Sequence, residues 1–384
     1  MKVLIVAHST KLSGGANRSL LSIIDKMCNE NNHVEVILPK KYGAMYDELE
    51  KRKVKTHYIA YGQIYGGKKL DKNRFLRTVI MNCKMIHDQI KSYFYSFKIR
   101  KDNFDVIYTN TSLPFFGGFL AKYLNIPHIW HCREFIYPKE DILPHNVFKK
   151  MAMLSQKVIV ISSAMKEAYK EVGEDKLQLI YNGIELNTTD PIKCEHTGYN
   201  IIQVARIVEA KGQHDAIKAM NIVVKKGYKD IVLHFAGSPI NKNSKYYLNL
   251  KEMINQYNLQ NNIKFCGEID GLKELRSIMD LELMCSKCEA FGRVTIEAMR
   301  SNILVVGTNS GGTKDIIKNN ETGLLYEPGN YEELAELILY AYNNKNEVIK
   351  IANNGFRYST ENFTAQQFKV VCDLLKGEVS RWKR

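Results

Sequence analysis

The sequence predicts an α/β protein made of two doubly wound domains, each with a parallel sheet covered by helices on both faces. Short, continuously apolar strands alternate with helical stretches along the whole chain. This alternation occurs in two successive sets, separated by a polar segment. The length of 384 residues agrees with this organisation, because it exceeds one typical domain and is sufficient for two.

The first half of the chain has five apolar segments that indicate buried strands, with helices between them that are clearest at 17–30 and 115–124. The predicted strands are 2–7, 34–38, 105–109, 127–130 and 157–161. The second half repeats this order, with predicted strands at 200–205, 231–237, 263–267, 281–286 and 303–307. Segment 321–330 then indicates a turn, a strand and a second turn.

The polar segment between the two sets indicates a domain boundary. Residues 186–199 include Pro191 and have no apolar periodicity, so they are expected to form the linker. The first domain is therefore predicted at 1–185 and the second at 200–360. The remaining residues, 361–384, are predicted to form a helix too polar to be a domain of its own.

The composition, with 45% hydrophobic and 25% charged residues, is ordinary for a soluble globular protein. The apolar runs are far shorter than the ~20 residues that span a bilayer. The N-terminal run indicates a buried strand, because a signal peptide has a longer apolar core. Among eight scattered cysteines, Cys285 and Cys288 form a lone CxxC, for which simple thiols are favoured over a zinc or redox site. We expect a cytoplasmic protein with reduced cysteines.

The net charge of +14 is concentrated in one segment. From Lys68 to Lys101, seven Lys and three Arg oppose Asp71 and Asp88, which gives +8. Apolar residues recur there at three- and four-residue steps, which predicts a basic amphipathic helix or helix pair. Two interpretations stay open: a helix drawn to anionic lipid head groups at the inner face of the cell membrane, or a helix packed on its domain with solvated lysines. Nucleic acid is not expected as a partner, because no binding motif accompanies the charge.

Several candidate ligand contacts follow predicted strands, where open α/β sheets bind ligands. Gly14 and Gly15 precede a helix after the first strand, and their backbone could approach a phosphate or an acceptor, although a plain tight turn is an alternative. Arg206 and Lys211 follow strand 200–205 and could stabilise a departing diphosphate. The alternative is two solvated cations near Glu209.

Two carboxylates flank a short turn at 290–293. Glu289 lies before the predicted helix 294–300, and Glu297 lies within it. Both could accept hydrogen bonds from the paired hydroxyls of a sugar or a ribose. The first backbone N–H groups of this helix, at Val294 and Thr295, could receive a phosphate. Read without context, two glutamates at this spacing are also compatible with simple solvent exposure.

The remaining candidates are a histidine and a second glycine turn. His131 ends a predicted strand, and either a structural or a functional role is open. The turn SGGTKD at 310–315 again precedes a helix. Neither GxGxxG nor GxxxxGK[ST] occurs, which argues against dinucleotide and P-loop sites. We expect no metal, because no Asp-x-Asp pair is present.

In combination, these motifs resemble the retaining glycosyltransferases of family 4, which have the GT-B architecture. The motifs that carry the resemblance are IYNGI, VARIVEAKGQHDAIKA, FAG, CEAFGRVTIEAM, SGGTKDII and TGLLYEPGN. Each motif alone is weak, but the ordered set is specific, and the resemblance covers nearly the whole chain, most strongly from Asn182 to Gly329. The resemblance implies two Rossmann-like domains that face each other across a cleft, with the last helix crossing back to the first domain and closure by a hinge.

The resemblance also implies roles for individual residues. Arg206 and Lys211 would bind the donor diphosphate. Glu289 would bind the donor-sugar hydroxyls, and Glu297 the ribose. His131 would approach the sugar ring from the first domain. The other residues that it places around the donor are Phe291, Gly292, Val294, Thr295 and Gly15.

The activity implied is transfer of a sugar from a nucleotide sugar, most commonly UDP-linked, with retention of configuration, no metal and no other cofactor. The acceptor implied is a glycan or a lipid-linked intermediate of cell-surface polysaccharide synthesis. Two alternatives stay open: a nucleotide-sugar epimerase of the same fold, and a non-catalytic partner subunit. Arg293 and Asp315 depart from the family pattern, and Arg293 suggests an unusual donor or an extra phosphate contact.

Overall fold

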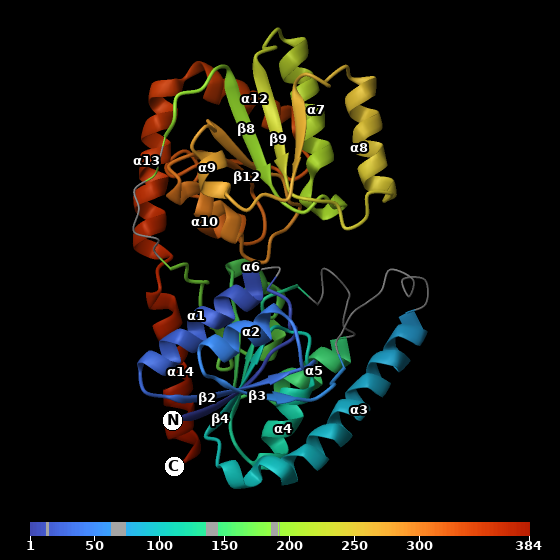
Figure 1. Ribbon diagram of the computed structural model, residues 1–384, viewed down its shortest axis with the longest axis vertical. Helices are drawn as coiled ribbons and strands as arrows, with labels where there is room; N and C mark the ends of the chain where they lie inside the picture. The colour runs from blue at the N-terminus through green and yellow to red at the C-terminus, as the bar shows by residue number, and fades with distance from the viewer. Residues whose placement is uncertain (13–14, 63–73, 136–144, 186–190, 192) are drawn as a thin grey trace. The chain divides into compact units, whose positions relative to one another are not determined.

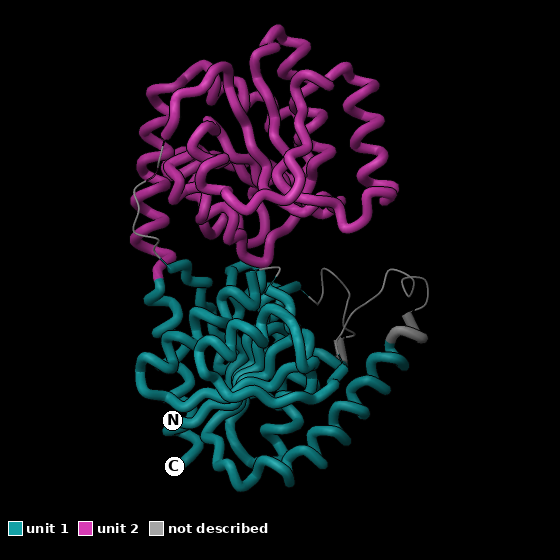
Figure 2. Tube along the Cα trace, in the orientation of Figure 1, with its two compact units in different colours: residues 1–185, 365–384 teal, residues 186–364 magenta. Residues whose placement is uncertain are grey.

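A computed structural model describes residues 1–12, 15–62, 74–135, 145–185, 191 and 193–384, with only the backbone at 74–77 and 145–146. The chain forms two compact units (Figure 2). Unit 1 comprises 1–185 and 365–384, and unit 2 comprises 186–364. Each unit has one parallel sheet with helices around it, which confirms the predicted fold class. Part of the predicted linker, at 186–190 and 192, lies outside the described residues.

The sheet of unit 1 has seven parallel strands in the order β3-β2-β1-β4-β5-β6-β7. The strands are β1 (Lys2–Val6), β2 (His33–Leu38), β3 (Lys55–Tyr58), β4 (Val106–Asn110), β5 (His128–His131), β6 (Lys157–Val160) and β7 (Leu177–Leu179). The five predicted strands match β1, β2, β4, β5 and β6. The two strands missed, β3 and β7, are the sheet edges, where a strand has one partner and needs fewer apolar residues.

Helices cover both faces of this sheet (Figure 1). In β1, Val3 and Ile5 pack toward α1, α2 and α14, whereas Leu4 and Val6 pack toward α3 and α4. The elements are α1 (Gly15–Asn29), α2 (Ala44–Lys51), α3 (Arg74–Ile99), η2 (Arg100–Asp102), α4 (Phe116–Leu124), α5 (His145–Met153), α6 (Ser163–Ala168), η3 (Lys170–Val172) and α14 (Gln366–Trp382).

Unit 2 has six parallel strands in the order β10-β9-β8-β11-β12-β13. They are β8 (Tyr199–Val204), β9 (Ile231–Ala236), β10 (Ile263–Gly267), β11 (Leu281–Met284), β12 (Leu304–Thr308) and β13 (Leu324–Tyr326). The helices are η4 (Glu209–Lys211), α7 (Gln213–Lys225), α8 (Lys245–Gln256), α9 (Leu272–Arg276), α10 (Arg293–Arg300), α11 (Thr313–Ile316), α12 (Tyr331–Asn343) and α13 (Lys345–Asn362). All six predicted strands of this half are present.

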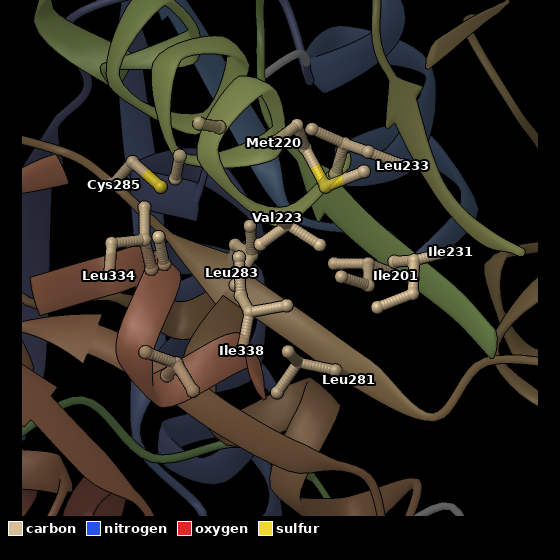
Figure 3. Packing of buried hydrophobic residues seen from close by; sticks show 14 of the residues in the cluster. Ile201, Met220, Val223, Ile231, Leu233, Leu281, Leu283, Cys285, Leu334 and Ile338 are labelled. Atoms are coloured by element: carbon tan, nitrogen blue, oxygen red, sulfur yellow. The ribbon is translucent and has the colours of Figure 1, made fainter. Parts of the chain in front are cut away.

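The main core of unit 2 lies between its sheet and the helices α7 and α12 (Figure 3). Leu281 and Leu283 of β11 are fully buried against Val223 of α7 and Ile338 of α12. Each such side chain contributes roughly 1.5–3 kcal/mol on burial. This packing fixes the sheet whose carboxyl edge carries the candidate site.

The helix predicted over 361–384 is present as α14 but begins later, at Gln366, because residues 361–362 are the end of α13. Phe363 between them is buried, and its ring lies 5.9 Å from the ring of Phe291. Burying this ring takes the chain out of the helical path. As a result α13 belongs to unit 2 and α14 to unit 1.

A long basic helix is present where one was predicted. The helix α3 spans 26 residues from Arg74 to Ile99, while the beginning of the predicted segment, 68–73, lies outside the described residues. Within the part of the chain that the structure describes, no helix is long and apolar enough to cross a membrane.

Candidate functional site

The candidate site of unit 2 lies at the carboxyl edge of its sheet. The loop after β8 carries Arg206 and Lys211, and the loop after β11 carries Glu289. A third loop, after β12, brings Gly311 against the second one. Parallel strands end at the same edge, so side chains from separate segments of the sequence meet there.

Lys211 and Glu289 form an ion pair, with 2.5 Å between Nζ of Lys211 and Oε1 of Glu289. Their side chains are 27% and 16% exposed, so the pair is partly withdrawn from water. The hydroxyl of Ser286 donates a hydrogen bond to the same Oε1 over 2.6 Å. Lys211 and Glu289 were predicted to lie at one ligand site, and the structure brings them into direct contact.

The pKa of Glu289 lies below its ordinary value although the side chain is largely withdrawn from water. Burial alone would raise this pKa, but the positive charge of Lys211, hydrogen bonds from Lys211 and Ser286, and the charge of Arg206 together lower it. Glu289 is therefore ionised at neutral pH and acts as a hydrogen-bond acceptor. Arg206 is exposed, so its guanidinium group is open to a ligand.

Polar side chains hold the loop from Arg206 to Lys211 in place. The amide of Gln203 donates to the carbonyl of Lys211 over 2.6 Å, and that of Gln213 donates to the carbonyl of Arg206 over 3.0 Å. Gly212 has φ +67°, and a Cβ there would lie 2.0 Å from the carbonyl oxygen of Cys285. A glycine is thus required for the two loops to approach each other.

The loop that carries Glu289 is also fixed from the other side. The backbone N–H of Gly312 donates to the carbonyl of Glu289 over 2.8 Å. The hydroxyls of Thr308 and Ser310 donate to the carbonyls of Ser286 and Lys287, each over 2.7 Å. The predicted turn before α11 therefore serves to position Glu289.

Glu297 lies on α10 in a separate group of charges. Its carboxylate is 3.9 Å from Nη1 of Arg276 and 4.0 Å from Nη2 of Arg293. Arg276 also forms a two-pronged ion pair with Glu282, with distances of 2.8 and 2.9 Å. Glu297 remains 29% exposed, whereas Glu282 is fully buried. Glu297 thus lies between a buried ion pair and solvent.

The turn that begins α10 differs from the prediction in where the helix starts and in which backbone N–H groups are free. The helix begins at Arg293, after Gly292 with φ +108°. The backbone N–H of Thr295 already donates to the carbonyl of Gly292 over 3.0 Å, so Thr295 is wrongly predicted as a free phosphate donor. Val294 is partly exposed, whereas Phe291 is 3% exposed and packs on Phe363. Phe291 thus anchors the loop in the core.

In unit 1, His131 is the last residue of β5 and is almost fully buried. Its Nδ1 atom is 2.6 Å from the hydroxyl of Tyr108, and its Nε2 atom is buried with no hydrogen-bond partner among the described residues. Burial, and then the charge of Arg133, lower the pKa of His131 well below its ordinary value. The ring is therefore neutral at neutral pH.

Arg133, which the sequence analysis did not single out, is central to the same edge of unit 1. It is 5% exposed, and its guanidinium group donates to the side-chain oxygens of Asn110 and Asn182. Burial and the charge of Arg133 lower the pKa of His8 to about 4. Its place two residues after β5 was one signal in the sequence, because polar side chains that follow a strand lie at the edge of the sheet where ligands bind.

The first glycine turn is only partly described. Gly15 is the first residue of α1 and is exposed, while Gly14 lies outside the described residues. The cysteines of the CxxC differ in environment: Cys285 is buried, which raises its pKa to about 12, and Cys288 is half-buried.

The chain matches two family models that together span most of its length. Residues 13–188 match the model described as Glycosyltransferase Family 4. Residues 190–358 match the model described as Glycosyl transferases group 1. The junction of the two matches falls at the boundary between unit 1 and unit 2.

Among curated proteins, the chain is similar to the capsular polysaccharide biosynthesis glycosyltransferase CapM of Staphylococcus aureus. The two are 27% identical over 236 residues, which are 61% of this chain and 59% of CapM. It is also similar to the N-acetyl-alpha-D-glucosaminyl L-malate synthase of Bacillus anthracis. This identity is 22% over 311 residues, which are 75% of this chain and 80% of the synthase.

Among solved structures, the chain is similar to HepE of Anabaena, crystallised in complex with UDP and glucose. The TM-score is 0.76 at 21% identity, covering 98% of this chain and 99% of HepE. A glycosyltransferase from Rickettsia africae gives a TM-score of 0.79 at 22% identity, covering 98% of each chain. These similarities show that the fold is shared.

Proposed function

Because the chain belongs to the glycosyltransferases of family 4, with the GT-B fold, we propose that it transfers a sugar from a nucleoside diphosphate sugar to a hydroxyl group of an acceptor. The observation that carries the proposal is the ion pair of Lys211 with Glu289, held beside the exposed Arg206. This group offers two cations for a diphosphate and one ionised carboxylate for hydroxyl groups.

The two cations act on the leaving group. When the bond between the sugar and the diphosphate breaks, negative charge gathers on the diphosphate oxygen. Arg206 and Lys211 stabilise this charge more strongly than that of the intact donor, which lowers the barrier. Catalysis then needs neither a metal nor a protein nucleophile, and in our proposal the leaving phosphate accepts the proton of the acceptor hydroxyl as the configuration is retained.

The carboxylates orient the donor. Glu289 accepts hydrogen bonds from the hydroxyls of a hexose, and Glu297 accepts those of the ribose. In unit 1 we assign His131 to the donor sugar, through the unpaired Nε2 of its neutral ring. We place Gly15 and the N–H of Val294 near the phosphates, because each lies at the beginning of a helix.

For the donor we propose a UDP-sugar, and for the acceptor a glycan or a lipid-linked intermediate of cell-surface polysaccharide. The structures of HepE with UDP support the first choice, and the similarity to CapM supports the second. We further propose that the acceptor is presented at the inner face of the cell membrane. We therefore propose a cytoplasmic protein that associates peripherally with that membrane.

Release of nucleoside diphosphate from a panel of nucleotide sugars, in the presence of EDTA, tests this proposal. We expect one donor, with uridine as its base, to be cleaved, either slowly by water or faster with an acceptor glycan. An isomer of the donor without diphosphate release would instead identify an epimerase. Donor binding without cleavage, with every acceptor tried, would identify a non-catalytic subunit.

A further inference from the structure

The helix α3 of unit 1 has two apolar faces, of which the fold uses one. Met81, Met85 and Ile99 are buried on the inner face, where the hydroxyl of Ser92 also donates to the carbonyl of Phe116 in α4 over 3.0 Å. The outer face carries six large hydrophobic side chains that are exposed: Val79, Ile86, Ile90, Tyr93, Phe94 and Phe97. We call these six the α3 stripe.

The α3 stripe is continuous along the helix. Successive members are seven, four, three, one and three residues apart, so they lie along one side of α3, opposite the buried residues. Phe94 is 68% exposed and Phe97 54%. The ring of Tyr93 lies 5.0 Å from that of Phe97 and 5.3 Å from that of Tyr123 in α4. A contiguous exposed apolar surface of this kind marks an interaction site.

The charges beside the α3 stripe are of one sign. Lys84, Lys91 and Lys98 are seven residues apart, which places them in one row along its flank. Asp88 is the only acidic residue in the sequence of α3. Its side chain is fully buried and accepts a hydrogen bond from the backbone N–H of Gly62 over 2.7 Å. The outer side of α3 is therefore apolar and basic.

We propose that the outer side of α3 binds the surface of an anionic lipid bilayer, with the α3 stripe in the acyl boundary and the lysine row at the head groups. Tyr93 is of an aromatic type that gathers at membrane–water interfaces, and Phe94 and Phe97 are of a type found on the apolar face of interfacial helices. The guanidinium carbon of Arg100 lies 5.7 Å from the ring centroid of Phe97, so a cation accompanies one exposed aromatic ring of the α3 stripe.

A second copy of this chain fits the surface less well. Two α3 helices paired along their stripes would bring their lysine rows close together, and the only carboxylate of α3 is buried. Like charges on paired helices destabilise the pair. Anionic head groups instead complement both the apolar and the basic parts of the surface.

The inference deepens the proposed association with a membrane but does not depend on turnover, because lipid binding is measured without donor or acceptor. The full chain is sedimented with large vesicles of phosphatidylcholine alone, or of phosphatidylcholine mixed with phosphatidylglycerol. We expect binding to the mixed vesicles that weakens as salt is added. Failure of sugar transfer would leave this result unaffected.

Two variants test the two parts of the surface. Phe94→Ser with Phe97→Ser should weaken vesicle binding by about tenfold or more, because two aromatic side chains no longer leave water. Lys84→Gln with Lys98→Gln should weaken it on the order of tenfold, and only with anionic vesicles. Matched controls are Ile240→Ser, an exposed apolar residue of unit 2, and Lys53→Gln with Lys166→Gln, exposed lysines elsewhere in unit 1.

Circular dichroism confirms that each variant folds. Three outcomes would overturn the proposal: no binding to anionic vesicles, equal binding to neutral and anionic vesicles, or an equal loss in the control variants. A concentration-dependent dimer that Phe94→Ser with Phe97→Ser abolishes, in a protein that ignores vesicles, would overturn it in favour of a contact between two copies.

Discussion

We expect the Glu289→Gln variant to lose about 10²- to 10³-fold in kcat/KM for donor cleavage. The amide keeps the size of the side chain but removes the negative charge that pairs with Lys211. Lys211 then lacks the partner that orients it toward the diphosphate, and the sugar hydroxyls lose a charged acceptor. The measurement is the initial rate of nucleoside diphosphate release at several donor concentrations.

The matched control is Glu336→Gln on the exposed side of α12, which should leave kcat/KM unchanged. A cycle with Lys211→Met adds a test of the pair. If the two side chains act together, the double variant is hardly worse than either single one. A Glu289→Gln enzyme with full kcat/KM would contradict the role assigned to this carboxylate.

The second large effect concerns the stability of unit 2. We expect Arg276→Met to lower the free energy of unfolding of this unit by about 3–5 kcal/mol, because it leaves the fully buried Glu282 without its partner. Burial already raises the pKa of Glu282, with Arg276 opposing the shift. Because the pKa of Glu282 is higher in the folded chain than in the unfolded chain, where it is about 4.3, the free energy of unfolding decreases as the pH rises above that value. The destabilisation by Arg276→Met should therefore be smaller at acid pH, where Glu282 is protonated and needs no cation.

Urea denaturation measures the loss of stability of unit 2, and unit 1 of the same chain serves as the reference. Both tryptophans, Trp130 and Trp382, belong to unit 1, so fluorescence follows unit 1 and circular dichroism follows both units. The double variant Arg276→Met with Glu282→Leu should recover most of the stability, since it removes both buried charges. The control Lys264→Met removes an exposed cation of β10. A single variant as stable as the parent chain would contradict the expectation.

The interior of the fold was predictable because the central strands are largely apolar, as in KVLIV of β1 or LVVGT of β12. Elements without such an apolar run, and contacts between distant residues, were not predicted. The edge strands β3 and β7 are short and partly polar, since they pair on one side only. The break between α13 and α14 depends on the contact of Phe363 with Phe291, two residues far apart in sequence.

In the candidate site, too, the sequence predicted the residues, whereas their contacts became visible only in the structure. Ordered motifs identified Arg206, Lys211 and Glu289, and the ion pair between the last two required the structure. The use of the Thr295 N–H within its own turn was also not visible from helix position alone. Arg276 could have been suspected, because Glu282 is an acid within an apolar strand, and a buried acid needs a cation close by.

The central claim is that the group of Arg206, Lys211 and Glu289 in unit 2 binds the diphosphate end of a nucleotide sugar. A crystal structure of the full chain with UDP tests this claim most directly. The account predicts the diphosphate on the side chains of Arg206 and Lys211, with the ribose hydroxyls on Glu297. A nucleotide bound elsewhere, with the ion pair of Lys211 and Glu289 untouched, would contradict it.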